Sequence, residues 1–212
     1  MIIGIPTYQK VDLLDVAGPY EIFGWMKQFA PALKVEVYLI AAKPGLIQTR
    51  DGLVMKPHKV FREVPKLDVL WTPGGDPSAL NKLMNDPART YLNFLVTRSL
   101  KARWVASVCE GALLLAAAGL LDGYKVTTHW AFVPCLKKFP AVKVVRGHPR
   151  FVIDRNRITG GGISSGLDEA LKLVELLTSQ KVAQQVQQVT QYYPRPPVKS
   201  KIPAAQGCPL DS

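Results

Sequence analysis

Short apolar segments alternate with longer amphipathic segments along most of the chain. The apolar segments are rich in β-branched and aromatic residues, which predicts buried strands at 1–5, 34–42, 67–72, 104–108, 125–128 and 142–145. Helical patterns lie between them, at 19–29, 77–85, 87–100, 112–118, 165–177 and 181–191. Strands that alternate with helices favour a mostly parallel sheet covered on both faces, so the predicted class is α/β.

Two further segments, 46–56 and 151–159, have the turn residues of β-hairpins. After residue 193 the chain becomes rich in Pro and Lys and lacks the apolar residues that a core requires. We therefore predict a single domain over residues 1–197 and an extended tail over 198–212 that takes no part in the core.

The stretch from Trp104 to Gly119 has the layout of a nucleophile elbow. The apolar strand ends at Val108, and a run of strong helix formers starts at Ala112, with Cys109 at the joint. A sharp turn of this kind places the joint residue at the carboxyl edge of the sheet, where a helix N-terminus favours the reactive thiolate. Cysteine is also among the most buried residue types, so a purely structural Cys109 is the competing interpretation.

Other candidates are expected at the same edge, because functional groups of parallel sheets gather at the carboxyl ends of the strands. Asp15 ends a predicted loop, 6–15, among apolar neighbours, where an acid either transfers protons or caps a helix. We favour proton transfer for Asp15 and interpret Asp12 as a surface residue. The backbone N–H groups of Gly75 and Glu110 are candidates for an oxyanion hole.

A second set of residues, His129, Trp130 and Ile163, is a candidate substrate pocket. His129 could act as a base for Cys109, or it could be a structural histidine at a strand end, which we favour. Ile163 follows the glycines at 160–162, which allow the backbone to approach a reactive group closely.

Charge and hydropathy bear on two classes of partner, nucleic acids and membranes; the small-molecule substrate that we also expect is implied by the family resemblance described below. The 212 residues carry a net charge of +11, much of it between Lys137 and Arg157. Without a recognisable nucleic-acid-binding motif, this basic patch indicates a solvated face, so nucleic-acid binding is not favoured. No apolar run is long enough for a membrane span, and the N-terminus lacks a signal-peptide pattern, so we expect a cytoplasmic protein.

The three cysteines are widely spaced and predict neither a disulfide framework nor a metal site. Cys135 lies in an apolar helical context and is expected in the core. Cys208 lies in the tail and is expected to be exposed. Cysteines without an expected disulfide are typical of proteins in a reducing compartment.

Six motifs in order resemble the ThiJ/PfpI superfamily and, within it, the isocyanide hydratases. They are Leu-Asp-Val-Ala-Gly-Pro at 14–19, Pro-Gly-Gly at 73–75, Ser-Val-Cys-Glu-Gly at 107–111, Ala-Ala-Gly-Leu-Leu at 117–121, Thr-Thr-His-Trp at 127–130 and Thr-Gly-Gly-Gly-Ile-Ser-Ser-Gly-Leu-Asp at 159–168. The resemblance implies a flavodoxin-like three-layer sandwich that forms a homodimer. It also implies a hydratase that uses no cofactor and converts an isocyanide into an N-substituted formamide through a cysteine thioimidate.

On the matching motifs, the resemblance implies Cys109 as the nucleophile and Asp15 as the acid–base residue. In the hydratases a Thr usually follows the nucleophile, and in protease-like members a His does, so Glu110 departs from both patterns. Two alternatives therefore stay open. One is another cysteine-dependent hydrolase or lyase, such as an amidase or a glyoxalase-like enzyme, and the other is a non-catalytic redox sensor that oxidises Cys109 reversibly.

Overall fold

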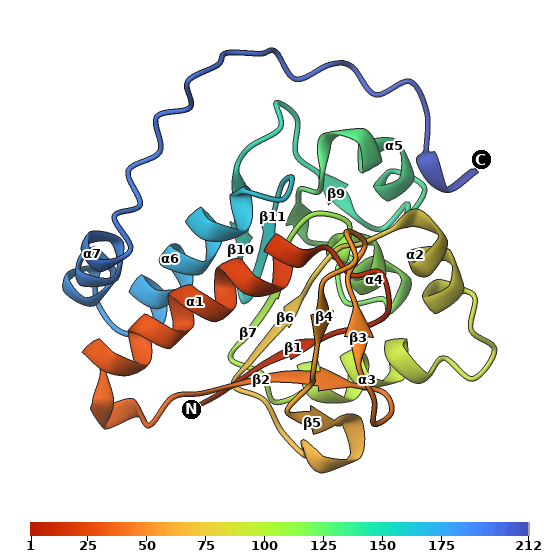
Figure 1. The fold of residues 1–212 in the computed structure, drawn as a ribbon. Helices are drawn as coiled ribbons and strands as arrows, with labels where there is room; N and C mark the ends of the chain where they lie inside the picture. The colour runs from red at the N-terminus through yellow and green to blue at the C-terminus, as the bar shows by residue number, and fades with distance from the viewer. Residues whose placement is uncertain (212) are drawn as a thin grey trace.

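The central sheet of the computed structural model, which describes residues 1–211, lies between two layers of helices (Figure 1). Its strand order is β10-β11-β7-β6-β1-β2-β5. The strands are β1 (Ile2–Pro6), β2 (Glu36–Ala41), β5 (Lys59–Val60), β6 (Val69–Thr72), β7 (Trp104–Ser107), β10 (Phe151–Asp154) and β11 (Arg157–Gly160). Neighbouring strands pair in parallel except β10 and β11, which form an antiparallel hairpin at one edge. The predicted flavodoxin-like α/β class is confirmed.

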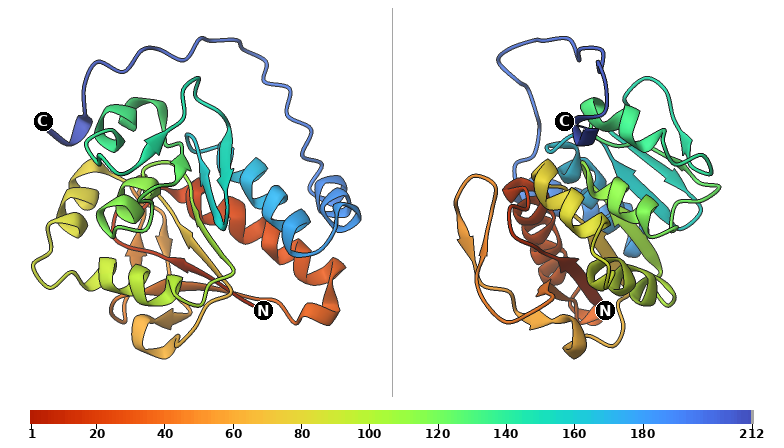
Figure 2. Two further views of the ribbon diagram at one scale, coloured as in Figure 1. Left: turned by 180° about the vertical axis from the view of Figure 1, so that it is seen from behind. Right: turned by 90° about the vertical axis from the view of Figure 1, so that its right-hand side faces the viewer.

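The sheet is covered by helices on both faces, as its continuous apolar strands require. Figure 2 shows one layer in front of the sheet and the other behind it. Helices α1 (Leu13–Phe29), α6 (Ser165–Leu177) and α7 (Gln180–Val189) contact one another on one face. Helices α2 (Pro77–Met84), α3 (Thr90–Ser99) and α4 (Gly111–Ala117) contact one another on the other face.

Shorter elements connect these layers. The predicted hairpin over 46–56 is present as β3 (Ile47–Gln48) and β4 (Val54–Met55). A small parallel pair, β8 (Lys125–Val126) and β9 (Lys143–Val144), flanks α5 (Val133–Leu136). Short 3-10 helices lie at Pro31–Leu33, Phe61–Glu63, Trp130–Phe132 and Pro209–Asp211. Within residues 1–211, no helix combines the length and the apolar character that crossing a membrane requires.

Helix α1 begins at Leu13, so the prediction that it starts at Pro19 is wrong. A proline inside a helix leaves the carbonyl four residues earlier without its N–H donor. That carbonyl belongs to Asp15, and it accepts a hydrogen bond of 3.0 Å from the buried indole N–H of Trp71 on β6. The indole replaces the missing donor, so the helix continues through Pro19, and the same bond fixes Asp15 against the sheet.

The tail does contact the core, which corrects two expectations. After α7 the chain arches over the side of the molecule that holds α5 and β9 (Figure 1). Cys208 is partly buried and forms a disulfide with Cys135, which is 2% exposed, across a Cα–Cα distance of 4.7 Å. The expectation of an exposed Cys208 and of no disulfide is wrong, because spacing along the sequence does not reveal that the tail folds back.

Candidate active site

The strand-to-helix turn predicted at Cys109 is present between β7 and α4. Cys109 has φ 57°, in the left-handed region that residues with a side chain rarely adopt. Two hydrogen bonds hold this strained residue. Its N–H donates to the carbonyl of Gly161 at 2.8 Å, and its carbonyl accepts from the hydroxyl of Thr128 at 2.7 Å. Strain that the surrounding structure maintains in this way is typical of functional sites.

Two glycines allow the chain to close tightly around this turn. A side chain at Gly111 would collide with the carbonyl of Thr72 at the end of β6. A side chain at Gly74 would lie 2.7 Å from the Glu110 nitrogen and 2.9 Å from the Cys109 Cβ, which is closer than real contacts allow. The Pro-Gly-Gly segment after β6 therefore lies directly against the elbow.

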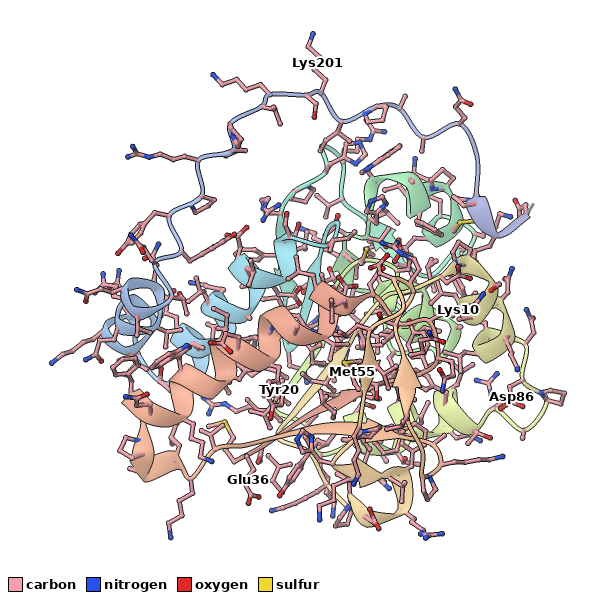
Figure 3. The ribbon with its side chains drawn as sticks, viewed as in Figure 1. Lys10, Tyr20, Glu36, Met55, Asp86 and Lys201 are labelled. Carbon is pink, nitrogen blue, oxygen red and sulfur yellow. A yellow bond between two sulfur atoms is a disulfide. The ribbon has the colours of Figure 1, made fainter. Side chains whose placement is uncertain are left out.

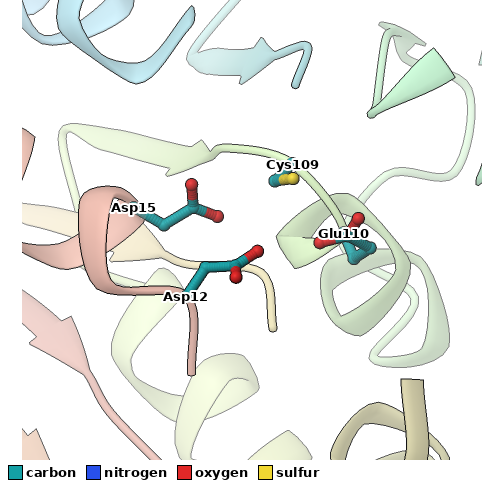
Figure 4. Close-up of side chains that lie close together, drawn as sticks. All are labelled: Asp12, Asp15, Cys109 and Glu110. Carbon is teal, nitrogen blue, oxygen red and sulfur yellow. The ribbon is translucent and has the colours of Figure 1, made fainter. Parts of the chain in front are cut away.

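Three buried carboxyl groups surround the thiol. One carboxylate oxygen each from Asp12, Asp15 and Glu110 lies, with the Cys109 sulfur, in a group whose members are all within 4.8 Å of one another (Figure 4). We call the three carboxyl groups the acidic cluster. All four residues are buried. The structure thus brings together the predicted pair, Cys109 and Asp15, and places two further acids beside them.

Asp12 was not predicted as a site residue. Its interpretation as a surface residue is wrong. It is only 2% exposed, and its carboxylate pairs with the guanidinium of Arg50 at 3.0 Å. Arg50 comes from the β3–β4 hairpin, whose contact with Asp12 no local pattern reveals. Asp12 is the residue that precedes α1, so the prediction of a loop over 6–15 gave no reason to place it beside Asp15.

Burial makes the acidic cluster retain protons. The pKa of Asp15 is raised well above its ordinary value, first by burial and then by the charges of Glu110 and Asp12. A hydrogen bond of 2.8 Å from the Gly74 N–H to one Asp15 oxygen opposes this rise only in part, and the other oxygen has no partner among the described residues. Burial likewise raises the pKa of Glu110 to about 7. Its surroundings therefore favour the protonated form of Asp15, whereas Glu110 is divided between its two forms near neutral pH.

The Cys109 thiol is also protonated near neutral pH, which corrects the expectation of a helix-stabilised thiolate. Burial raises its pKa well above the ordinary value, and the charges of Asp15 and Glu110 raise it further. The Ile163 N–H faces the sulfur and lowers the pKa only in part. Helix α4 has only seven residues, and its weak N-terminal field does not outweigh a desolvated thiol beside carboxylates. The Glu110 carboxyl lies close enough to the sulfur to favour the protonated thiol.

The backbone donors predicted for an oxyanion hole lie near the Glu110 carboxylate. The N–H groups of Gly75 and Glu110 face the Glu110 carboxylate and lower its pKa in part. This carboxylate therefore competes with a substrate oxyanion for the two donors. The assignment of Gly75 and Glu110 to an oxyanion hole stays a prediction.

A cavity of about 350 Å³ lies next to the elbow and contains the three predicted pocket residues, His129, Trp130 and Ile163. Its lining includes Thr128 and Gly161, which hold Cys109 by the hydrogen bonds described above. The cavity is thus separated from the buried Cys109 by residues that hold the elbow in place.

His129 contacts the acidic cluster through Glu110. Its Nδ1 lies 4.0 Å from a Glu110 oxygen and accepts a 3.3 Å hydrogen bond from the N–H of Ala131, at the start of a 3-10 turn. Burial, with a smaller contribution from Arg50, lowers the pKa of His129, so the ring is neutral. These contacts support the structural interpretation of His129.

Glu169, a fully buried residue on α6, was also not predicted as part of the site. It lies under the elbow, where a side chain at Gly160 would collide with it. Burial raises its pKa well above the ordinary value, and the charge of Asp15 adds to the rise. Glu169 lies one residue beyond the motif at 159–168, and no pattern in the sequence marks it as buried.

Asp168 itself lies outside the acidic cluster. It pairs with Arg150 at 2.5 Å and accepts a 3.1 Å hydrogen bond from the Tyr192 hydroxyl. These contacts join the first turn of α6 to the segment that follows α7 and to the residue that precedes β10.

Residues 4–176 match the DJ-1/PfpI family. Over 201 residues the chain is 38% identical to an isonitrile hydratase from Pseudomonas putida, a match that covers 95% of this chain and 82% of that protein. Over 173 residues it is 29% identical to the HTH-type transcriptional regulator GbdR from Pseudomonas aeruginosa. That match covers 81% of this chain but only 45% of the regulator.

Solved structures agree with this assignment. A THiJ/PfpI family protein from Pseudomonas syringae superposes with a TM-score of 0.83 at 34% identity, covering 93% of this chain and 77% of that one. DJ-1 from Schizosaccharomyces pombe has the same fold, with a TM-score of 0.71 at 18% identity over 92% of this chain and 100% of that one. The predicted superfamily is confirmed, and the chain belongs to the DJ-1/PfpI family.

Proposed function

We propose that this protein is an isocyanide hydratase-like enzyme, which adds water to an isocyanide and releases an N-substituted formamide. One observation carries the proposal. The Cys109 thiol lies in a single buried group with a neutral acid, Asp15, and with a carboxyl of pKa about 7, Glu110. A nucleophile, a proton donor and a proton acceptor are therefore in place together. The 38% identity to an isonitrile hydratase supports the choice of reaction.

In the first half of the proposed reaction, the Glu110 carboxylate accepts the thiol proton as the Cys109 sulfur attacks the terminal carbon of the isocyanide. The electron pair that develops on this carbon accepts a proton from neutral Asp15. The product is a thioimidate in which the carbon is bonded to sulfur, nitrogen and hydrogen. Glu110 now carries a proton and Asp15 is a carboxylate.

In the second half, the Asp15 carboxylate accepts a proton from water as the water oxygen adds to the same carbon. Glu110 donates its proton to the nitrogen. The carbon–sulfur bond then breaks, the proton of the new hydroxyl passes to sulfur, and the formamide leaves. All three residues return to their starting protonation states, so the cycle consumes only the isocyanide and one water.

The departure at Glu110 fits this route. A hydroxyl at this position could not accept the proton of a thiol whose pKa is raised, whereas a carboxyl with a pKa of about 7 can. A redox sensor is less well supported, because sensor cysteines have low pKa values and are accessible, whereas Cys109 is fully buried with a raised pKa.

The proposal includes a small-molecule substrate, no required cofactor, a homodimer and a cytoplasmic location. The disulfide between Cys135 and Cys208 is unusual for a reducing compartment, so its redox state in cells tests the location. Light scattering of the purified chain tests the dimer.

A substrate panel tests the reaction. Alkyl and aryl isocyanides, simple amides and methylglyoxal are offered to the wild type and to Cys109→Ser. The proposal predicts formamide from isocyanides with the wild type only. Turnover of amides or methylglyoxal without formamide formation would instead assign one of the alternative activities.

A further inference from the structure

The C-terminal tail closes one side of the candidate substrate pocket. We call residues 198–208 the strap. Its arch is marked by Lys201 in Figure 3. Ile202 of the strap lines the same cavity as His129, Trp130 and Ile163. The tail thus contributes an apolar side chain to the wall of this cavity.

A second cavity lies beneath the strap. It measures about 550 Å³ and is lined by Trp130, Ala131 and strap residues 203–208 together with Pro209. Trp130 lines both cavities, so the two cavities lie next to each other and the strap contributes to the lining of each.

The strap is held at its ends and is free of hydrogen bonds between them. Before it, the Tyr192 hydroxyl binds Asp168 at 3.1 Å. After it, Cys208 is bonded to Cys135, and Asp211 pairs with Lys138. Within the described chain, no hydrogen bond joins residues 194–207 to the body. The position of Ile202 therefore depends on the anchors, of which the disulfide is the covalent one.

We propose that the strap is a disulfide-anchored roof of the substrate pocket and that Ile202 limits the size of the group that reaches Cys109. The inference rests on the proposed function only in naming that group, the N-substituent of an isocyanide. A dithiol releases the roof by transferring two electrons to the Cys135–Cys208 bond. Each sulfur then takes up a proton, and the dithiol becomes a cyclic disulfide.

Access to Cys109 is measured by alkylation, which needs no hydratase activity. The variant Cys135→Ser/Cys208→Ser removes the anchor and leaves Cys109 as the one thiol of a chain that has three. Ile202→Ala removes the apolar contact, and Val198→Ala is the matched control, since Val198 is on the strap, 76% exposed and outside both cavities. Each protein is treated at pH 8.5 with iodoacetamide and, separately, with bulky N-(1-pyrenyl)maleimide, and peptide mass spectrometry gives the Cys109 rates.

The ratio of the bulky-reagent rate to the iodoacetamide rate is the readout, because both reagents need the same thiolate. If the open strap is a minor state of roughly 10% or less, releasing it raises this ratio about tenfold. We expect that rise in the double-serine variant, a smaller rise in Ile202→Ala and none in Val198→Ala. An unchanged ratio in both the double-serine variant and Ile202→Ala would overturn the proposal.

Wild-type protein treated with dithiothreitol provides a second route if the double-serine variant does not fold. Peptide mapping separates Cys109 from the two released thiols, and the ratio at Cys109 is again expected to rise about tenfold. The absence of isocyanide turnover would refute the proposed reaction but would leave these alkylation ratios, and therefore the roof, independently measurable.

Discussion

The chain buries two cysteines near short helices, and their surroundings give them opposite chemistry. Cys109, before α4, is fully buried, free and next to Asp15 and Glu110. Cys135, in α5, is almost as buried but is bonded to Cys208 of the tail. Burial alone therefore does not assign a role to a cysteine. The groups beside it decide whether the sulfur is part of a proton-transfer group or a covalent anchor.

The strongest test of this difference removes each sulfur in turn. Cys109→Ser should lower isocyanide turnover by roughly ten-thousandfold or more, the scale on which loss of a covalent nucleophile acts. Cys135→Ser/Cys208→Ser should keep turnover of a small isocyanide near the wild-type rate, because these sulfurs do not touch substrate. Product analysis by NMR measures both. Equal losses of isocyanide turnover in the two variants would contradict the assignment of different roles to Cys109 and to the disulfide.

Asp15→Asn comes next in expected size. The amide keeps the shape of the side chain but cannot donate or accept the catalytic proton, so turnover should fall by roughly a hundredfold or more. Asp76→Asn is the matched control, because Asp76 caps α2 through the Ser78 N–H and asparagine caps equally well. Near-normal turnover of a folded Asp15→Asn protein would remove Asp15 from the mechanism.

Glu110→Gln should change the pH profile more than the maximum rate. The proposed base is active as the carboxylate, so wild-type kcat/KM should rise with pH through about 7. Glutamine cannot accept the thiol proton, so this limb should disappear, with a loss of roughly tenfold or more at pH 8. A Glu110→Gln profile that retains the limb would assign it to another group.

Glu110 should also affect the stability of the fold, to a smaller extent. Whereas kcat/KM should rise with pH, the unfolding free energy should fall. A carboxyl with a raised pKa in the folded state binds a proton there that the unfolded chain has already lost, so the unfolding free energy falls as pH rises. For Glu110 the fall extends from its ordinary pKa, 4.5, to about 7 and amounts to about 3 kcal/mol.

Glu169→Gln isolates the same effect away from the thiol. Because burial raises the pKa of Glu169, the variant should melt higher than wild type at pH 8 and nearly equally at pH 4.5. Glu175→Gln, on the same helix but half-exposed, is the control. A variant that melts lower than wild type at pH 8 would show that the carboxylate is stabilised in the folded protein.

The features that the sequence predicted correctly are local ones. The strand-to-helix turn at Cys109, the hairpins and the bounds of α6 follow from apolar periodicity, glycines and turn residues within a few positions. The family was recognisable because its motifs lie in order along the chain.

The features that could not be predicted depend on contacts between distant segments. The continuation of α1 through Pro19 requires the indole of Trp71, and the disulfide requires the tail to fold back onto α5. The pKa of Cys109 was given the wrong direction, because a helix start is visible in the sequence while the burial of the thiol and the approach of Asp15 to it are not.

Trapping the covalent intermediate tests the central claim most directly. Wild-type protein is mixed with a small alkyl isocyanide, quenched within milliseconds and digested under conditions that preserve the thioimidate. The account predicts that the Cys109 peptide gains the mass of one isocyanide, that the adduct decays as formamide appears, and that Cys109→Ser shows neither. Formamide produced without any adduct on Cys109, or by the serine variant at the wild-type rate, would contradict it.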